Sequence, residues 1–192
     1  MGSEMIAALF VQRDGVYWDL PGVDPWDEER DARKYDGPWP VVAHPPCARW
    51  SMLAGLVEKR YGYKKGNDGG CFASALDSVR KWGGVLEHPA WSCAWPTHGL
   101  PRPTRRWNKT INNEWTCEVD QAAYGHKAQK RTWLLYVGTN PPPSLIWTKT
   151  KGTHQVSGFR AALLEIPKKE RAVTPLAFRD VLISMARSCR TG

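Results

Sequence analysis

The residues best able to do chemistry in this chain lie in three short segments, each next to an apolar run. The first segment carries Cys47 directly after two prolines, in His44-Pro-Pro-Cys-Ala-Arg-Trp-Ser51. The second is Val85-Leu-Glu-His-Pro89, and the third runs from Ala122 to Arg131 and leads into a strand-like run that ends at Gly138. A cysteine thiolate is a strong nucleophile, and a nearby carboxylic acid or guanidinium can stabilise the charge that its addition creates. The segments therefore predict a site for nucleophilic addition.

Short strands and helices are expected to position these segments. Apolar runs predict strands at residues 5–12, 40–44, 85–88 and 132–138, and helical spacing predicts helices at 26–35, 71–82 and 174–187. Turn residues predict turns at 20–25 and a basic loop at 100–109. This alternation predicts an α/β domain with a largely parallel sheet. In such sheets sites form outside the carboxyl ends of the strands, which is where Cys47 and Glu87 are expected.

The order and character of the three segments resemble those of the DNA (cytosine-5)-methyltransferases. That family has a Pro-Pro-Cys loop followed by a serine, a strand ending in Glu-Asn-Val, and a Tyr-Gly and Gln-x-Arg-x-Arg run before a strand ending in Val-Gly. The matching residues are Pro45, Pro46, Cys47, Ser51, Glu87, Tyr124, Gly125, Gln129 and Arg131. His88 and Pro89 replace the Asn and Val, Trp133 replaces the last Arg, and one extra residue precedes Gln129.

The resemblance implies a catalytic site made of Cys47, Glu87 and Arg131. The Cys47 thiolate would add to carbon 6 of a flipped cytosine, so that carbon 5 can attack an electrophile. Glu87, kept protonated because burial raises its pKa, would act on ring nitrogen 3, and Arg131 would hold the carbonyl oxygen. The substrate site would also include Pro45, Pro46, Ser51 and Gln129.

The resemblance further implies S-adenosylmethionine (SAM) as cofactor and a Rossmann-like, methyltransferase-type sheet. Family members bind SAM with a Phe-x-Gly-x-Gly turn after the first strand, and an acidic residue at the end of the next strand binds the ribose. Here Gln12-Arg-Asp-Gly15 follows the first strand, and only 46 residues precede Cys47. We therefore expect a truncated nucleotide-binding half, with Asp24 or Asp19 as the candidate ribose ligand.

The charge balance favours a polyanionic partner. Lys and Arg number 27 against 19 Asp and Glu, a net charge of +8, and cations that displace condensed counterions gain affinity for DNA. A cluster of cations between two site segments is expected to contact DNA phosphates: Arg102, Arg105, Arg106 and Lys109. A loop that is basic for solubility is the alternative. Some of the eleven tryptophans are available to stack on bases or to cover the rim of a cleft.

The five cysteines predict neither a disulfide framework nor a metal site. Their number is odd, they form no Cys-x-x-Cys pair, and their spacing with His88 and His98 fits no standard zinc module. Cys47 is expected to be the accessible cysteine, and Cys71 to lie in the core. A reducing cytoplasm, in a bacterium or a phage-infected cell, fits this usage. We expect no membrane span, because no apolar run reaches about 18 residues.

Three functions remain open from the sequence. The first is SAM-dependent methylation of cytosine carbon 5 in DNA. The second is an enzyme that keeps the Cys–Glu–Arg pyrimidine chemistry but uses another electrophile or a nucleotide substrate. The third is a non-catalytic DNA-binding relative, for instance a phage accessory or decoy protein. Residues 1–4 look like an addition ahead of a natural start at Met5, so one domain is expected over residues 5–190.

Overall fold

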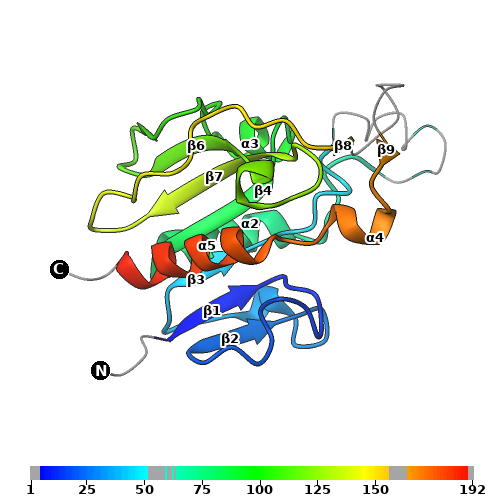
Figure 1. Cartoon of the computed structure of the whole chain (residues 1–192). Coiled ribbons are helices and arrows are strands. Elements are labelled where there is room, and N and C mark those ends of the chain that lie inside the picture. Colours follow the sequence, from blue (N-terminus) through cyan, green and yellow to red (C-terminus); the bar gives the residue numbers. More distant parts are fainter. Residues whose placement is uncertain (1–4, 52–58, 60–61, 63, 156–163, 190–192) are drawn as a thin grey trace.

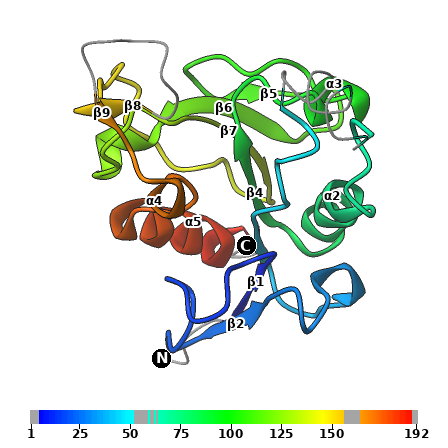
Figure 2. The ribbon, with the colours of Figure 1, turned by 90° about the vertical axis from the view of Figure 1, so that its right-hand side faces the viewer.

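A seven-stranded mixed sheet organises the molecule, with helices on both of its faces (Figures 1 and 2). The structure is a computed structural model that describes residues 5–51, 59, 62, 64–155 and 164–189. The strand order is β2-β1-β3-β4-β7-β6-β5. Helix α5 (Leu176–Ser188) covers one face of the sheet, and α2 (Cys71–Trp82) covers the other. The expected addition at residues 1–4 lies outside the described residues.

The first four strands are parallel, and the remaining pairings are antiparallel. The parallel strands are β1 (Ile6–Leu9), β2 (Val23–Trp26), β3 (Val41–Ala43) and β4 (Gly84–Pro89). Strand β7 (Arg131–Val137) is antiparallel to both β4 and β6 (Trp115–Asp120), so β6 runs in the same direction as β4. The α/β class is confirmed, but the sheet is less parallel than the sequence predicted. The ten residues 121–130 that join β6 to β7 are too few for the crossover that a parallel pair needs.

The smaller elements lie around this sheet. They are the 3-10 turns η1 (Ala32–Lys34) and η2 (Gln121–Tyr124), the helices α3 (Ala94–Thr97) and α4 (Lys168–Arg171), and the strands β5 (Asn108–Lys109), β8 (His154–Gln155) and β9 (Leu164–Glu165). Strand β5 pairs with β6 at one edge of the main sheet, whereas β8 and β9 form a separate two-stranded sheet. No helix in the described part of the chain combines the length and the apolar character needed to cross a membrane.

Side chains along each strand alternate between two apolar cores. On β4, Val85 joins the core beneath α5, where it meets Leu134 and Phe178. Its neighbour Leu86 joins the core beneath α2, with Phe72 and other side chains. Because alternate side chains share a face, Glu87 points to the α5 side and His88 to the α2 side. This alternation decides which charged residues meet at the end of the sheet.

One strand lies where the sequence predicted a turn and then a helix. Residues 23–26 form β2, and the expected helix at 26–35 is reduced to the 3-10 turn η1. Strand β2 is an edge strand, so the missing N–H of Pro25 removes no bond that the sheet needs. Asp31 adopts a left-handed conformation with φ of 54°, which prevents a continuous helix through this segment.

Most of the other expected elements are present near their predicted bounds. The helix expected at 71–82 is α2, and the one expected at 174–187 is α5. The four expected strands correspond to β1, β3, β4 and β7. The sequence did not predict β6, because Glu118 and Asp120 interrupt the apolar pattern expected of a strand that is almost entirely buried.

A substitution at Gly84 tests the parallel pairing of β3 and β4. A Cβ atom there would stand 2.0 Å from the carbonyl oxygen of Val41, and the φ of Gly84 is +120°. We expect Gly84→Ala to lower the free energy of unfolding by about 2–4 kcal/mol, because backbone atoms of β3 would have to move. Gly99→Ala is the control: its φ is also left-handed, at +70°, but no heavy atom lies within 4 Å of the added Cβ. Urea denaturation giving equal losses for both variants would contradict the described register.

Candidate active site

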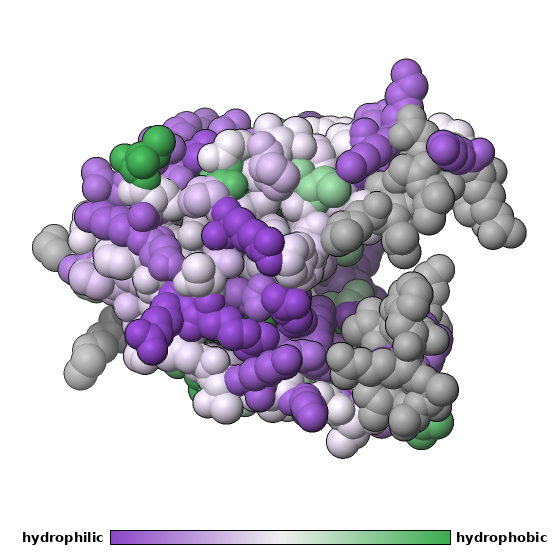
Figure 3. Space-filling model, turned by 90° about the horizontal axis from the view of Figure 1, so that it is seen from above, coloured by the Kyte–Doolittle hydropathy of each residue, from purple (hydrophilic) through white to green (hydrophobic). Residues whose placement is uncertain are grey.

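The candidate site lies at the carboxyl ends of β1, β3 and β4, beside the point where the order of the strands reverses. From β1 the chain goes outward to the edge strand β2 and then returns to β3 on the other side of β1. Such a switch point is where open α/β sheets bind ligands. The backbone N–H of His44 donates to the carbonyl of Leu9 across this point, at 3.0 Å. Seen from above, hydrophilic residues cover most of the described part of the surface, and strongly hydrophobic ones are scattered (Figure 3).

A chain of hydrogen bonds crosses the carboxyl ends of the strands. The Tyr17 hydroxyl and His44 Nε2 lie 2.8 Å apart, and His44 Nδ1 lies 3.0 Å from one carboxylate oxygen of Glu87. Gln121 Nε2 donates to the other Glu87 oxygen at 3.1 Å and to the Thr132 hydroxyl at 2.9 Å. Both oxygens of Glu87 therefore have a partner. The resemblance assigned no role to Tyr17, His44 or Gln121.

The charge state of Glu87 is the reverse of the one expected. Its carboxyl is buried, which by itself raises the pKa. The hydrogen bond and charge of His44, together with the charge of Lys130, outweigh burial and lower the pKa of Glu87 to about 2. Glu87 is therefore ionised at neutral pH. Each oxygen keeps one lone pair that these partners do not use, so Glu87 can be protonated only by a donor that approaches this side when substrate binds.

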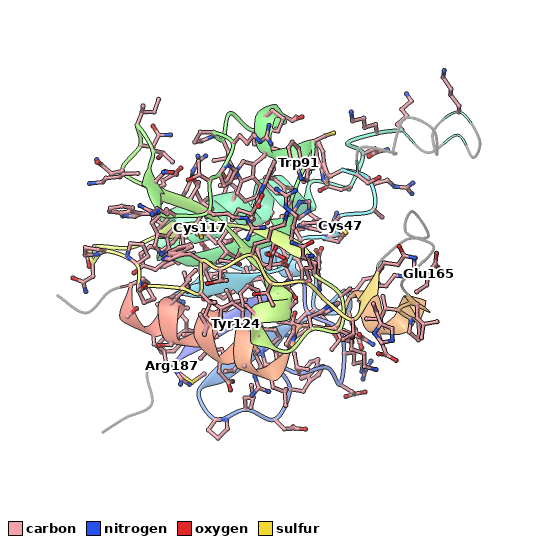
Figure 4. All side chains as sticks on the ribbon, turned by 45° about the horizontal axis from the view of Figure 1, so that its top comes forward. Cys47, Trp91, Cys117, Tyr124, Glu165 and Arg187 are labelled. Atoms are coloured by element: carbon pink, nitrogen blue, oxygen red, sulfur yellow. The ribbon has the colours of Figure 1, made fainter. Side chains whose placement is uncertain are left out.

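Cys47 is exposed on the loop that follows β3, as expected for a nucleophile (Figure 4). Protein atoms that partly desolvate the thiol, together with the negative charge of Glu87, raise the pKa of Cys47. The charge of Lys130 acts in the opposite direction and favours the thiolate. The free thiol is thus mostly protonated at neutral pH, and its activation has to accompany substrate binding.

Lys130 is the cation that shares a site with Cys47 and Glu87. Burial lowers the pKa of Lys130, while the charges of Glu87 and Cys47 support the protonated form. Its ammonium group donates to the carbonyl of Val173 at 3.3 Å. Its backbone has a φ of 39°, just before β7 begins. Lys130 was overlooked because it stands between the two residues, Gln129 and Arg131, that matched the family pattern.

Arg131 does not join Cys47 and Glu87. Its guanidinium donates to both oxygens of the Glu118 carboxylate, at 2.8 to 3.0 Å. Arg131 lies opposite Asp120 in the β6–β7 register, on the α2 side of the sheet, whereas Glu87 lies on the α5 side. The expected Cys47–Glu87–Arg131 trio is therefore replaced by Cys47, Glu87 and Lys130, because strand alternation sends neighbouring residues to opposite faces.

The four residues expected to line the substrate site have different surroundings. Pro45 is buried, while Pro46 and Ser51 are exposed on either side of Cys47. Gln129 instead donates to Asp120 at 3.0 Å, in the cluster that also holds Arg105. The structure thus keeps Pro45, Pro46 and Ser51 on the Cys47 loop but places the side chain of Gln129 elsewhere.

The structure also separates the four cations expected to contact phosphate. Arg105 makes two bonds of 2.9 Å to the buried Asp120, so it holds the end of β6. Lys109 lies near Trp115 at the start of β6, roughly 16 Å away at the usual rise of a strand. Arg102 and Arg106 are exposed, and Arg102 covers the ring of Trp91. These residues do not form one phosphate-binding cluster.

The switch point does not fit SAM as the family binds it. In residues 10–22, all of which the structure describes, no helix and no Gly-x-Gly turn follow β1; Phe10 takes the left-handed conformation there, with φ of 59°. The buried Tyr17, from the same connection, extends to His44 at the carboxyl end of β3. Asp24 lies within β2 and is bound to Trp26 and Arg30, and Asp19 is exposed in the preceding loop. The acidic residue that follows β2 is instead Asp27, which is buried and accepts from the backbone N–H of Arg30 at 2.9 Å.

The cysteines fall into three classes of exposure. Cys47 is exposed, Cys71 and Cys93 are half-buried, and Cys117 and Cys189 are buried. The expectation that Cys71 lies in the core was wrong, because it occupies the first position of α2, beside the polar residues that open the helix. Cys47 remains the accessible candidate.

His88, which replaces the family asparagine, supports the Cys47 loop from the α2 side. It is fully buried, with its ring 5.1 Å from that of Phe72. Burial lowers the pKa of His88 to about 4, and the carbonyl of Pro46 is among the groups that oppose this shift. His88 is therefore neutral at pH 7 and packs as an aromatic ring beneath the loop.

Comparison of the chain with protein families, curated proteins and solved structures found no match. The assignment of the site therefore depends on its own geometry.

Alkylation of Cys47 tests the two opposing charges at its thiol. With iodoacetamide at pH 8 and peptide mapping by mass spectrometry, we expect Cys47 to react before the other cysteines. Glu87→Gln should accelerate its labelling and Lys130→Met should slow it, each by about threefold if the pKa moves by half a unit. Changes in the same direction for both variants, or Cys71 reacting first, would contradict the described electrostatics.

The lowered pKa of His88 predicts how the stability of the fold depends on pH. Its pKa is about 4 in the folded chain against 6.5 for an ordinary histidine, so between these values only the unfolded state binds the proton. The free energy of unfolding should therefore fall by roughly 3 kcal/mol as the pH decreases from about 6.5 to 4. His88→Asn should flatten this part of the profile, measured by urea denaturation. His98→Asn, which also removes a ring that contacts Phe72, should leave the slope as it is.

Proposed function

We propose that this protein activates carbon 5 of cytosine in DNA by adding the Cys47 thiol to carbon 6 of the ring. The observation that carries the proposal is the meeting of an exposed Cys47, an ionised Glu87 and the cation of Lys130 at the carboxyl ends of β3 and β4. The parallel strands β1 to β4 support the truncated Rossmann-like sheet that the resemblance implies. The target base would leave its duplex to reach the thiol.

The addition requires one proton to move within the site. As the bond from sulfur to carbon 6 forms, the thiol proton passes to the Glu87 carboxylate and from there to ring nitrogen 3. The S–H bond breaks, the S–C and N–H bonds form, and the ring carries no net charge at the end. Lys130 would stabilise the negative charge that develops on the sulfur and the ring during this transfer. Carbon 5 is then enamine-like and can take an electrophile.

His44, Tyr17 and Gln121 would position the carboxylate for this transfer. His44 and Gln121 each hold one oxygen of Glu87, and Tyr17 holds the far side of the His44 ring. A carboxylate fixed at both oxygens cannot rotate away from the base, and such preorganisation lowers the cost of reaching the transition state. Burial, followed by the charge of Glu87, raises the pKa of Tyr17, so the phenol stays protonated.

Methyl transfer from SAM is the reaction that the resemblance implies, but we draw no step through SAM. The segment after β1 lacks the family's cofactor turn, and its buried Tyr17 extends to His44 instead. The proposal is therefore confined to the activation of carbon 5, which any electrophile would need. An enzyme that uses another electrophile fits these residues better than a SAM-dependent methyltransferase does.

DNA binding without catalysis is the second candidate function. Two observations favour it: the thiol of Cys47 is protonated at neutral pH, and both oxygens of Glu87 are engaged by protein groups. A binding protein would need neither a free carboxylate nor a thiolate.

Exchange of the hydrogen at carbon 5 separates these two functions. Because the enamine can take a proton from water and lose the original one, reversible addition should release tritium from cytosine that carries it at carbon 5. We expect single-stranded DNA and the purified protein to release tritium into water without any added cofactor. Cys47→Ser should abolish the release, and Lys130→Met should lower it by about 100-fold.

Lys127→Met provides the matched control for the lysine substitution. Lys127 lies three positions away, is exposed and pairs with Glu170 at the surface, so its loss should leave the exchange rate unchanged. If the wild-type protein released no tritium from single-stranded DNA, duplex DNA or dCMP, the catalytic proposal would be wrong. DNA binding in that case would leave the non-catalytic function as the explanation.

A further inference from the structure

A ladder of aromatic rings runs from the core to the surface beside the candidate active site. Trp95 is fully buried and its ring lies 5.6 Å from that of Trp133, which is itself buried. Trp133 lies 6.0 Å from Trp91, whose side chain reaches solvent and remains 37% exposed. The guanidinium carbon of Arg102 stands 3.7 Å from the centre of the Trp91 ring. The outermost step of the ladder is therefore a cation stacked on an exposed indole.

Buried charges hold this ladder in place. The Trp133 indole N–H donates to Glu118 at 2.9 Å, and the same carboxylate binds Arg131 through both of its oxygens. The guanidinium carbon of Arg131 lies 5.2 Å from the centre of the Trp91 ring. Glu118 is buried, so its two hydrogen-bonded partners have little freedom to move. The ladder is a rigid, preorganised structure rather than a loose surface contact.

The backbone of Trp91 is in a conformation that bulky residues avoid. Its φ is 69°, in the left-handed region, where a residue with a large side chain is an outlier. The flanking backbone is fixed: the N–H of Ala90 donates to the backbone carbonyl of Arg131, and the N–H of Cys93 donates to the backbone carbonyl of Trp50. Strain of this kind persists only where the surroundings impose it, and it gathers at ligand sites. The conformation keeps an exposed indole on the surface beside two arginines.

The ladder and the candidate active site belong to the same end of the sheet. Cys47 follows β3 and Trp91 follows β4, and these strands are parallel neighbours. Lys130 and Arg131 are adjacent in sequence, yet Lys130 acts on Cys47 while Arg131 lies against Trp91. Figure 4 shows the labelled Cys47 and Trp91 side chains. A strand of nucleic acid lying across this end would meet both features.

We propose that Arg102, Trp91 and Arg131 form a stacking platform for a base of single-stranded DNA, next to the nucleotide presented to Cys47. Because the Arg102 guanidinium lies over the Trp91 ring, a base would stack on the outer plane of that guanidinium, with the indole beneath it. Such stacking does not depend on the base sequence, and the same guanidinium groups attract phosphate. The net charge of +8 complements a polyanion. The choice of DNA as the occupant rests on the proposed function, but stacking requires no chemistry at Cys47.

Binding of a fluorescein-labelled 12-nucleotide single-stranded DNA, followed by anisotropy, tests the platform. We expect Trp91→Ala to weaken binding about 10-fold and to weaken binding of the matching blunt duplex much less, because stacked bases of a duplex do not offer their faces. Trp39→Ala is the matched control: Trp39 is 38% exposed but precedes β3, at the opposite end of the strand from Cys47. Trp39→Ala should bind like the wild type.

A second pair of variants separates stacking from packing. Trp91→Phe keeps an aromatic face and should bind within about threefold of the wild type, while Trp91→Leu keeps apolar bulk against Trp133 and should bind as weakly as Trp91→Ala. Arg102→Ala should reduce the slope of log affinity against log salt by about 0.7, as expected for one phosphate contact on a single strand. Equal binding by the Phe and Leu variants, or equal losses for single strand and duplex, would overturn the platform.

The outcome can be separated from that of the proposed function. Tritium exchange reports the chemistry at Cys47, and anisotropy reports binding to the platform, so each is measured independently. If DNA binding depends on Trp91 but no tritium is exchanged, the platform is supported and the catalytic proposal is contradicted. If Trp91→Leu changes neither DNA binding nor tritium exchange, the chemistry at Cys47 is supported and the platform is contradicted. If substitution of Trp91 abolished binding of a partner protein but left DNA binding unchanged, the platform would also be contradicted.

Discussion

A buried carboxylate on β4 determines how the carboxyl end of this sheet is built. An isolated charge in an apolar core costs several kcal/mol, and it persists only with hydrogen bonds and opposite charge around it. Glu87 obtains these from His44, Gln121 and Lys130, which come from three separate parts of the chain. Satisfying one carboxylate therefore fixes the start of the Cys47 loop, the turn after β6 and the start of β7. Tyr17 is recruited in turn, because the second nitrogen of His44 also needs a partner.

The sheet separates two charge systems that are close in sequence. Glu87 and Lys130 act on the α5 side, while Glu118 and Arg131 meet on the α2 side. Both pairs lie beside the first half of β7, one next to β4 and the other next to β6, and the alternation of side chains keeps them on opposite faces. The first system is linked to the thiol of Cys47 and the second to the aromatic ladder. One end of the sheet can thus hold an exposed thiol and an exposed indole with separate charges around each.

The sequence was sufficient to predict the elements that carry the site, but not the partners within it. Helix α2 has the predicted bounds because helical spacing runs between two pairs of glycines. Cys47 and Glu87 are where the ends of β3 and β4 were expected. The side chain that would face them, Lys130 or Arg131, depends on the strand register, which a single sequence does not specify. Strand β6 was not predicted because the arginines that neutralise its buried Glu118 and Asp120 come from other parts of the chain.

The two edges of the main sheet differ from its interior in a way that affects how the protein behaves at high concentration. The edge strand β2 has four residues, one of them Pro25, whose carbonyl is already taken by the Arg30 side chain. The opposite edge strand, β5, has two residues, both of them exposed and one of them the cation Lys109. Short edges with proline or lysine offer a poor template for a further strand. The apolar interior strands are thereby shielded from edge-to-edge aggregation, even though exposed indoles such as Trp39 and Trp91 remain on the surface.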